Sequence, residues 1–312
     1  MTIYNCSQAT VKALKSAQID LLICSSGFES RASHLATQLS NKEIRSKVVL
    51  SFDDRVNEYS RAKNDHFFSE NYYQRLTSDG DEENDIVQYL NEFLSTCTQN
   101  EITIAVDYSC MTRIWYGAIL KYFRFQKIVD KKITIFFCYS LARYVKSPEK
   151  ETFNFHIGPI RGFTNISIPQ NPTALIICLG YEKNRALGLY EYLDGETFLF
   201  ISDDVKEPKY SQEVRANNYE IIEATKNQNK YEYSINDMEH TYSLISSLCK
   251  DLSKDYRIVI APCGPKPFTL LSLLVALIQD NIDAWRISSG KESVPVDKKP
   301  EGEIIVYQVS FG

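Results

Sequence analysis

Short apolar runs alternate with helix-length segments along the whole chain. The runs hold four to seven consecutive residues that are mostly apolar and do not alternate with polar ones, as in LLICSS from Leu21 and LIIC from Leu175. Runs of this kind are typical of strands that are buried on both faces of a parallel sheet. The segments between them are long enough for helices. The pattern therefore predicts an α/β fold with mostly parallel sheets.

The apolar pattern occurs twice, in the same order. Each half reads as strand, helix, strand, a variable polar stretch, helix, strand, helix and strand. The matching segments are LLICSSGFESRA (21–32) with LIICLGYEKNRA (175–186), KVVLSFDD (47–54) with TFLFISDD (197–204), EITIAVDYSCMTRIWYGAIL (101–120) with RIVIAPCGPKPFTLLSLLVALI (257–278), and KKITIFFCYSLARY near Ile133 with EGEIIVYQVSF near Ile304. We infer an internal duplication into two tandem Rossmann-like units. A stretch rich in Pro and Gly marks the boundary, which predicts units at 1–165 and 166–312.

Composition and charge narrow the possible partners. The chain has 312 residues, of which 35 are Lys or Arg and 40 are Asp or Glu, so its net charge is -5. No global positive field draws it to duplex nucleic acid or to anionic lipid. The longest apolar stretch, Phe268 to Ile278, is shorter than the ~20 residues of a membrane span. The first residues lack the apolar core of a signal peptide, so we expect a cytoplasmic protein with reduced cysteines and no membrane contact.

Candidate ligand-binding residues follow the first strand of each half. They are Gly27, Glu29 and Arg31 in the first half and Gly180, Glu182 and Arg185 in the second half. Glycine permits a tight turn, and a following helix offers N–H groups to an anion. In one interpretation, Arg faces a phosphate and Glu faces a ribose hydroxyl. In the other, Glu and Arg pair with each other and join helix to sheet.

A second pair of turns precedes the long apolar helices. The first-half turn contains Asp107, Ser109, Thr112 and Arg113, and the second-half turn contains Gly264 and Lys266. Hydroxyl and cationic side chains are the types that bind phosphate oxygens. Asp and Ser at these positions also suit helix capping, which is compatible with ligand binding. Four scattered histidines and no metal-ligand spacing predict no metal and no cofactor.

The second turns carry a resemblance to a known family. CGPKPFTLLSLLVALI from Cys263 resembles the GGTK-type turn and helix of CARF domains, with Pro265 where threonine is usual, and DYSCMTRIWYGAIL resembles a diverged copy. Two such units in one chain are also similar to a SAVED domain. The resemblance implies that a cyclic oligonucleotide binds in the cleft between the halves. It further implies that the ligand lies near a set of turn residues, namely Gly27, Ser109, Thr112, Gly180, Gly264 and Lys266.

Three functions remain open from the sequence. The first is a cytoplasmic sensor that binds a nucleotide-type second messenger and signals to a separate effector in antiviral defence. The second is a metal-independent nucleotide hydrolase or phosphodiesterase, with Glu29, Asp107 and Glu182 as candidate acid/base groups. The third is a structural subunit of a defence complex. Tyr72 and Tyr231 lie in polar stretches and are candidates for a partner surface or for base stacking.

Overall fold

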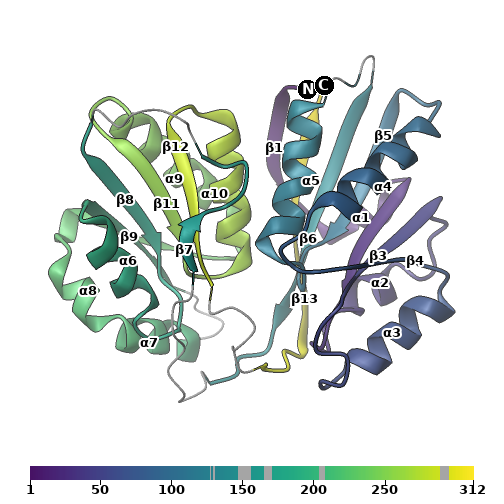
Figure 1. Cartoon of the computed structure of the whole chain (residues 1–312), viewed down its shortest axis with the longest axis horizontal. Helices are drawn as coiled ribbons and strands as arrows, with labels where there is room; N and C mark the ends of the chain where they lie inside the picture. Colours follow the sequence, from purple (N-terminus) through teal and green to yellow (C-terminus); the bar gives the residue numbers. More distant parts are fainter. Residues whose placement is uncertain (127, 129–130, 147–155, 165–170, 204–207, 289–294) are drawn as a thin grey trace. The chain divides into compact units, whose positions relative to one another are not determined.

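Figure 1 presents the structure of the chain, a computed structural model, which describes residues 1–126, 128, 131–146, 156–164, 171–203, 208–288 and 295–312. The chain divides into two compact units. Unit 1 comprises Met1–Arg143 and Pro295–Gly312, and unit 2 comprises Tyr144–Val294. Each unit is an α/β body with its own sheet and its own core, as the apolar pattern predicts.

Unit 1 contains a seven-stranded sheet. Its strands are β1 (Ile3–Ala9), β2 (Leu21–Ser26), β3 (Ser46–Phe52), β4 (Gln74–Ser78), β5 (Glu101–Asp107), β6 (Lys132–Ala142) and β13 (Pro300–Phe311). Their order across the sheet is β1-β13-β6-β5-β2-β3-β4. The strands from β6 to β4 are parallel, whereas β13 is antiparallel to both β6 and β1.

Unit 2 contains a six-stranded sheet. Its strands are β7 (His156–Pro159), β8 (Thr173–Cys178), β9 (Glu196–Ser202), β10 (Lys230–Tyr233), β11 (Arg257–Pro262) and β12 (Ile282–Ser288). Their order is β10-β9-β8-β11-β12-β7, with only β7 antiparallel to its neighbour. Numbered by their order within each unit, the parallel strands of both sheets run 3-2-1-4-5, which is the order of a Rossmann-like half. The recurrence agrees with an internal duplication.

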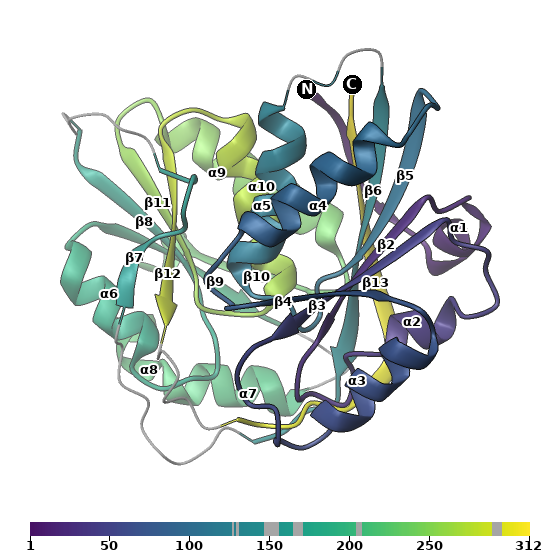
Figure 2. The same cartoon turned by 45° about the vertical axis from the view of Figure 1, so that its right-hand side comes forward.

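Helices cover both faces of each sheet (Figures 1 and 2). In unit 1 they are α1 (Val11–Ser16), α2 (His34–Gln38), α3 (Arg61–Glu70), α4 (Asn84–Ser95) and α5 (Arg113–Phe125). In unit 2 they are α6 (Arg185–Leu193), α7 (Pro208–Asn217), α8 (Tyr219–Ala224), α9 (Met238–Leu252) and α10 (Lys266–Ile278), with a 3-10 turn at Asn227–Asn229. In unit 1, α1 to α3 share one core cluster while α4 packs with α5; in unit 2, α6 to α8 share a cluster while α9 packs with α10.

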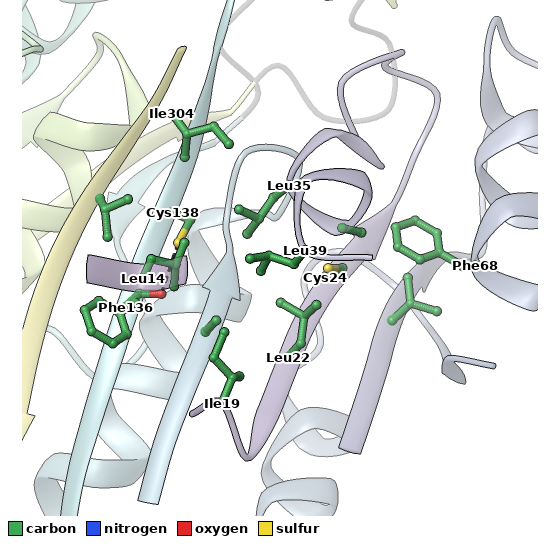
Figure 3. Close-up of a cluster of buried hydrophobic side chains, with 14 residues drawn as sticks. Leu14, Ile19, Leu22, Cys24, Leu35, Leu39, Phe68, Phe136, Cys138 and Ile304 are labelled. Carbon is green, nitrogen blue, oxygen red and sulfur yellow. Dashed lines mark hydrogen bonds between the residues drawn. The ribbon is translucent and has the colours of Figure 1, made fainter. Parts of the chain in front are cut away.

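The core beneath α1 to α3 shows why the first strand reads as continuously apolar. Leu22 and Cys24 of β2 point toward Leu35 of α2 and toward Leu39 just after it, and Phe68 of α3 closes the cluster (Figure 3). Every residue of β2 is buried, because helices cover both of its faces. Complete burial of a Leu or Phe side chain contributes about 1.5 to 3 kcal/mol, so these few side chains are a main source of the stability of unit 1.

The C-terminal strand corrects the predicted boundaries of 1–165 and 166–312. β13 was expected to close the second half, but it pairs along its length with β6, from Ile133 opposite Phe311 to Ala142 opposite Pro300. Residues 295–312 therefore belong to unit 1. In unit 2, the position that matches β6 is taken by β12. The apolar pattern identifies β13 as a buried strand, but it carries no information about which sheet that strand joins.

Candidate functional site at the carboxyl edges of the sheets

The turns singled out in the sequence follow neighbouring strands in each sheet. β2 lies beside β5 in unit 1, and β8 lies beside β11 in unit 2. The strand order reverses between these neighbours, and ligands of open parallel sheets bind at such a reversal. We name residues 27–31 and 180–185 the first turns, and residues 107–113 and 262–266 the second turns. Together they form the carboxyl edge of each sheet.

Arg31 ties the first turn of unit 1 to the rest of its edge. Its side chain is 1% exposed, and its Nε lies 2.6 Å from Oε2 of Glu29. The two terminal nitrogens donate to the carbonyl oxygens of Ser140, at 2.9 Å, and Ser109, at 3.1 Å. Burial lowers the pKa of Arg31, but the Glu29 carboxylate, Tyr139 and Cys110 together outweigh it, and the pKa is raised overall. These contacts fit the interpretation in which Glu29 and Arg31 pair with each other and join helix to sheet.

N–H groups of that first turn, which could bind an anion, already bond to groups of unit 1. Asp297, in the segment that leads into β13, accepts hydrogen bonds from the backbone N–H of Ser30 and from its hydroxyl, both at 2.7 Å. The N–H of Arg31 donates to the carbonyl of Lys298 at 3.2 Å. A phosphate was expected to accept from N–H groups of this turn. The Asp297 carboxylate holds that position in unit 1.

The second turn of unit 1 is also internally bonded. Asp107 accepts from the N–H of Ser109 at 3.1 Å and from its hydroxyl, while the Ser109 Oγ accepts from the N–H of Ser140 at 2.8 Å. Thr112 caps α5 by accepting from the N–H of Trp115 at 3.3 Å, and its hydroxyl donates to the carbonyl of Gly80 at 2.6 Å. Ser109 is fully buried. The capping role expected at this turn falls to Thr112, and Arg113 begins α5 as a half-buried residue.

Unit 2 forms its edge by close approach of two glycine turns. A Cβ on Gly180 would overlap the carbonyl oxygen of Cys263. A Cβ on Gly264 would lie 2.5 Å from Sγ of Cys178 and 2.7 Å from the carbonyl oxygen of Leu179. Both glycines are therefore required by packing between the first and second turns. Gly27 of unit 1 has no such role, since its Cβ would meet Phe52 at an ordinary 3.4 Å.

Polar side chains of the unit 2 edge are more accessible than those of unit 1. The ion pair between Nη1 of Arg185 and Oε1 of Glu182 spans 3.3 Å, and the Glu182 side chain is 31% exposed. Lys266 is half-buried and begins α10, a helix of 13 residues with no side-chain cap at Pro265. Pro267 in the first turn of α10 has no N–H to satisfy. Polar contacts of a ligand are thus easier to provide here than at the filled edge of unit 1.

Two buried asparagines were missed by the sequence reasoning. The Asn64 amide donates to the carbonyls of Gly27 and Glu29, both at 2.9 Å. The Asn218 amide donates to the carbonyl of Gly180 at 2.7 Å. The two asparagines follow the glycines by 37 and 38 residues, so each holds the first turn of its unit in the same way. That repeated spacing was a signal in the sequence.

The three candidate acid/base groups differ in their exposure to solvent. Asp107 is 2% exposed and lies in the protein interior, and Glu29, whose side chain is 16% exposed, is paired with Arg31. Glu182 is the most accessible of the three. Burial raises the pKa of the thiols of Cys24 and Cys138 beneath the unit 1 edge, which keeps them neutral and poor nucleophiles. Roles in catalysis for Glu29, Asp107 and Glu182 stay predictions.

The tyrosines expected to serve as surface groups lie elsewhere. Tyr72 is highly exposed but precedes β4, at the amino edge of the sheet. Tyr231 stacks on Phe200, with ring centroids 5.2 Å apart and planes at 20°. Neither residue belongs to the first or second turns.

Comparisons with known proteins add little to this site. No protein-family model matches the chain, and no curated protein matches it. A solved structure described as the cytoplasmic domain of a prokaryotic cation chloride cotransporter aligns with 88% of this chain and 98% of its own, at 11% identity and a TM-score of 0.25. This similarity is too low to bear on function. In the described part of the chain, no helix is long and apolar enough to cross a membrane, and no three His, Cys, Asp or Glu side chains form a metal-binding group.

Proposed function

We propose that the chain binds a nucleotide-type second messenger, of the cyclic oligonucleotide class, at the carboxyl edges of its two sheets. In this proposal the protein is a cytoplasmic sensor that passes the signal to a separate effector in antiviral defence. The resemblance of the second turns to CARF and SAVED units supports the ligand class and the setting. The cleft expected between the two halves stays a prediction.

One observation carries the proposal: a cation begins the same helix in both units. Arg113 is the first residue of α5 and Lys266 is the first residue of α10, and each helix has 13 residues. Each helix follows the strand next to the strand-order reversal. A cation at a helix N-terminus adds its charge to the partial positive charge of the helix, so both positions favour a phosphate.

The bonding within unit 1 indicates which turns a phosphate would use. Asp297 accepts from the N–H of Ser30, and Arg31 is committed to Glu29, so the first turn of unit 1 offers little to an anion. The second turns end in the half-buried cations Arg113 and Lys266, each at the first position of a 13-residue helix. On this placement we assign phosphate binding to Arg113 and Lys266, and we assign a positioning role to Arg31.

The proposal is tested by thermal shift and calorimetry with cyclic di-, tri- and tetranucleotides and with common mononucleotides. We expect one class of cyclic nucleotide to stabilise the wild type by mass action, about 2.7 kcal/mol at a ligand concentration 100 times its Kd. Lys266→Ala and Arg113→Ala should each weaken binding about 10-fold or more, because a hydrogen bond to a charged group contributes about 1.5 to 3 kcal/mol.

Matched controls are Lys254→Ala and Lys132→Ala. Both lysines are exposed and lie near the amino ends of strands, Lys254 before β11 and Lys132 at the start of β6. If the controls weaken binding as much as Lys266→Ala, the effect is one of net charge and the assigned site is wrong. Chromatography of the nucleotide after incubation separates sensing from turnover. A consumed ligand favours the hydrolase, and no shift with any nucleotide contradicts the proposal and favours the structural subunit.

A further inference from the structure

An aromatic pair flanks the first turn of each unit. In unit 1, Phe28 follows Gly27 and contacts Tyr59 of the loop before α3, with ring centroids 6.2 Å apart and planes at 44°. In unit 2, Tyr181 follows Gly180 and contacts Tyr210 of α7, with centroids 5.7 Å apart and planes at 84°. The two pairs join equivalent parts of the duplicated fold. Phe28 and Tyr59 lie outside the core cluster of unit 1, whereas Tyr181 and the half-buried Tyr210 pack against the core cluster of unit 2.

The unit 1 pair presents an exposed ring on a strained loop. Tyr59 is 61% exposed, and both Arg55 and Tyr59 have left-handed backbone conformations, with φ of 51° and 37°. Such conformations cost about 1 to 3 kcal/mol each, and they persist only when neighbouring structure enforces them. Packing does not explain this strain, because most of the Tyr59 side chain is exposed.

The surrounding contacts hold the loop in place. Arg61, which is 3% exposed, donates to the carbonyls of Phe52 at 2.6 Å and Asp54 at 2.9 Å. The N–H of Ser60 donates to the carbonyl of Phe28 at 3.1 Å. The Tyr59 hydroxyl donates to the carbonyl of Pro295 at 3.1 Å. The exposed ring of Tyr59 is thus fixed at both its backbone and its hydroxyl. Stacking of a ligand on this ring therefore costs little side-chain entropy of Tyr59.

We propose that each aromatic pair is a stacking platform for one nucleobase, with Tyr59 and Tyr210 as the contact rings. The assignment rests on the proposed nucleotide ligand and adds the subsite for its bases. Every base has a π-face, and stacking on an aromatic side chain is tolerant of base identity. The platforms lie at the first turns, whereas the phosphate cations lie at the second turns, so base and phosphate have separate places on one edge.

Charge near Tyr59 favours a base over a phosphate. The Arg55 guanidinium lies 5.3 Å from the centre of the Phe28 ring, and its Nε lies 3.8 Å from a carboxylate oxygen of Asp54. Asp53 is exposed on the same loop. Carboxylates repel phosphate, but they accept hydrogen bonds from the amino groups of adenine, guanine or cytosine. The platform of unit 1 is therefore suited to an amino-bearing base.

The test uses adenosine as the probe, with saturation-transfer NMR on the full chain. We expect saturation to reach the adenine ring protons in the wild type and to fall at least 5-fold in the double variant Tyr59→Ala/Tyr210→Ala. The matched control is Tyr72→Ala/Tyr192→Ala, two tyrosines that are 89% and 64% exposed, of which Tyr72 shares the left-handed backbone of Tyr59. Equal loss in both double variants, or in neither, would overturn the platform.

A second measurement separates the ring from its hydroxyl. Tyr59→Phe keeps the aromatic face and removes the hydrogen bond to Pro295, so adenosine contact should stay within about 2-fold of the wild type. Loss as large as that of Tyr59→Ala would assign the effect to the Pro295 contact and contradict stacking. For a cyclic nucleotide that binds the wild type, Tyr59→Ala should raise Kd roughly 5- to 150-fold.

The two proposals fail in different ways. If no cyclic nucleotide binds but adenosine contact depends on Tyr59 and Tyr210, the platform stands and the sensor function fails. If a cyclic nucleotide binds through Lys266 and Arg113 with no effect of the tyrosines, the sensor function stands and the platform is wrong. Urea unfolding of each variant checks that the substitutions leave the fold intact, above all at Tyr210, which is half-buried and packs against the unit 2 core.

Discussion

The carboxyl edges of the two units occupy the same place in the same strand order but are bonded differently. In unit 1, side chains fill the edge: the buried Arg31 bonds three neighbours, and the half-buried Asp297 accepts a hydrogen bond from the N–H of Ser30, which a phosphate would otherwise use. In unit 2, the backbones of the two turns approach each other at Gly180 and Gly264, and the ion pair at the edge is partly exposed. In unit 1, side chains make the hydrogen bonds of the edge. In unit 2, the two turns pack closely because Gly180 and Gly264 have no side chains.

This difference teaches that a duplicated motif need not keep a duplicated role. Arg31 and Arg185 occupy equivalent positions in the repeats, yet Arg31 is 1% exposed and Arg185 is 14% exposed. A buried ion pair is costly to break, because the remaining charge has no water to solvate it. A partly exposed pair, such as Arg185 and Glu182 at 14% and 31% exposure, contributes less to stability because water screens it. Unit 1 should therefore depend on its edge for folding far more than unit 2 does.

The largest expected effect is that of Arg31→Ala. The substitution leaves Glu29 and the carbonyls of Ser109 and Ser140 without their donor, and we expect unit 1 to lose about 3 to 5 kcal/mol of unfolding free energy. Arg185→Ala should cost about 0 to 1 kcal/mol in unit 2. Urea unfolding followed by tryptophan fluorescence measures both.

The two tryptophans allow each unit to be followed separately. Trp115 is fully buried in α5 of unit 1, and Trp285 lies in β12 of unit 2. In a Trp285→Phe background the signal reports unit 1, and in a Trp115→Phe background it reports unit 2. Equal losses for Arg31→Ala and Arg185→Ala would remove the contrast between the two edges.

A smaller effect is expected from the glycines, in the opposite unit. Gly180→Ala forces a Cβ onto the carbonyl of Cys263, and overpacking of this kind typically costs 1 to 3 kcal/mol. Gly27→Ala is the matched control, since its Cβ meets only Phe52 at 3.4 Å, and we expect a change within about 0.5 kcal/mol. The urea unfolding midpoint read through Trp285 should fall for Gly180→Ala, and the midpoint read through Trp115 should not change for Gly27→Ala. A destabilised Gly27→Ala would show that the unit 1 turn is as tightly packed as that of unit 2.

The sequence predicts the fold well because its signals are local. Continuous apolar runs such as Leu21–Ser26 identify buried parallel strands, and the repeated order of strands and helices identifies two Rossmann-like units. The assignment of β13 to unit 2 was wrong, because strand pairing between Ile133 and Phe311 depends on how the chain returns after unit 2. The apolar pattern along a segment does not indicate which sheet the resulting strand joins.

The candidate site was harder to predict because its residues are joined by contacts that are distant in sequence. Glu29 and Arg31 could equally face a ligand or each other, and only the positions of Ser109 and Ser140 explain why Arg31 points inward. Asp297 lies 267 residues beyond Ser30, so no spacing rule connects them. Asn64 and Asn218 are the exception, since the duplication repeats their spacing from the glycines.

The smallest expected effect concerns the caps of the two long helices. Thr112 caps α5, and Pro265 takes the same place before α10 with nearly the same backbone, φ of -72° and ψ of 160° against -62° and 149°. Thr112→Ala should cost unit 1 about 1 kcal/mol, and Thr112→Ser should retain most of that through its hydroxyl. Pro265→Thr should change unit 2 by less than about 0.5 kcal/mol, because a new cap worth about 1 kcal/mol is offset by about 0.4 to 1 kcal/mol of added freedom in the unfolded chain. Unfolding curves read through Trp115 and Trp285 measure both changes. A loss of unfolding free energy in unit 2 well above 0.5 kcal/mol would mean that Pro265 also holds the second turn against Gly180. The close packing of backbone at Gly180 and Gly264 would then include Pro265, the residue before Lys266.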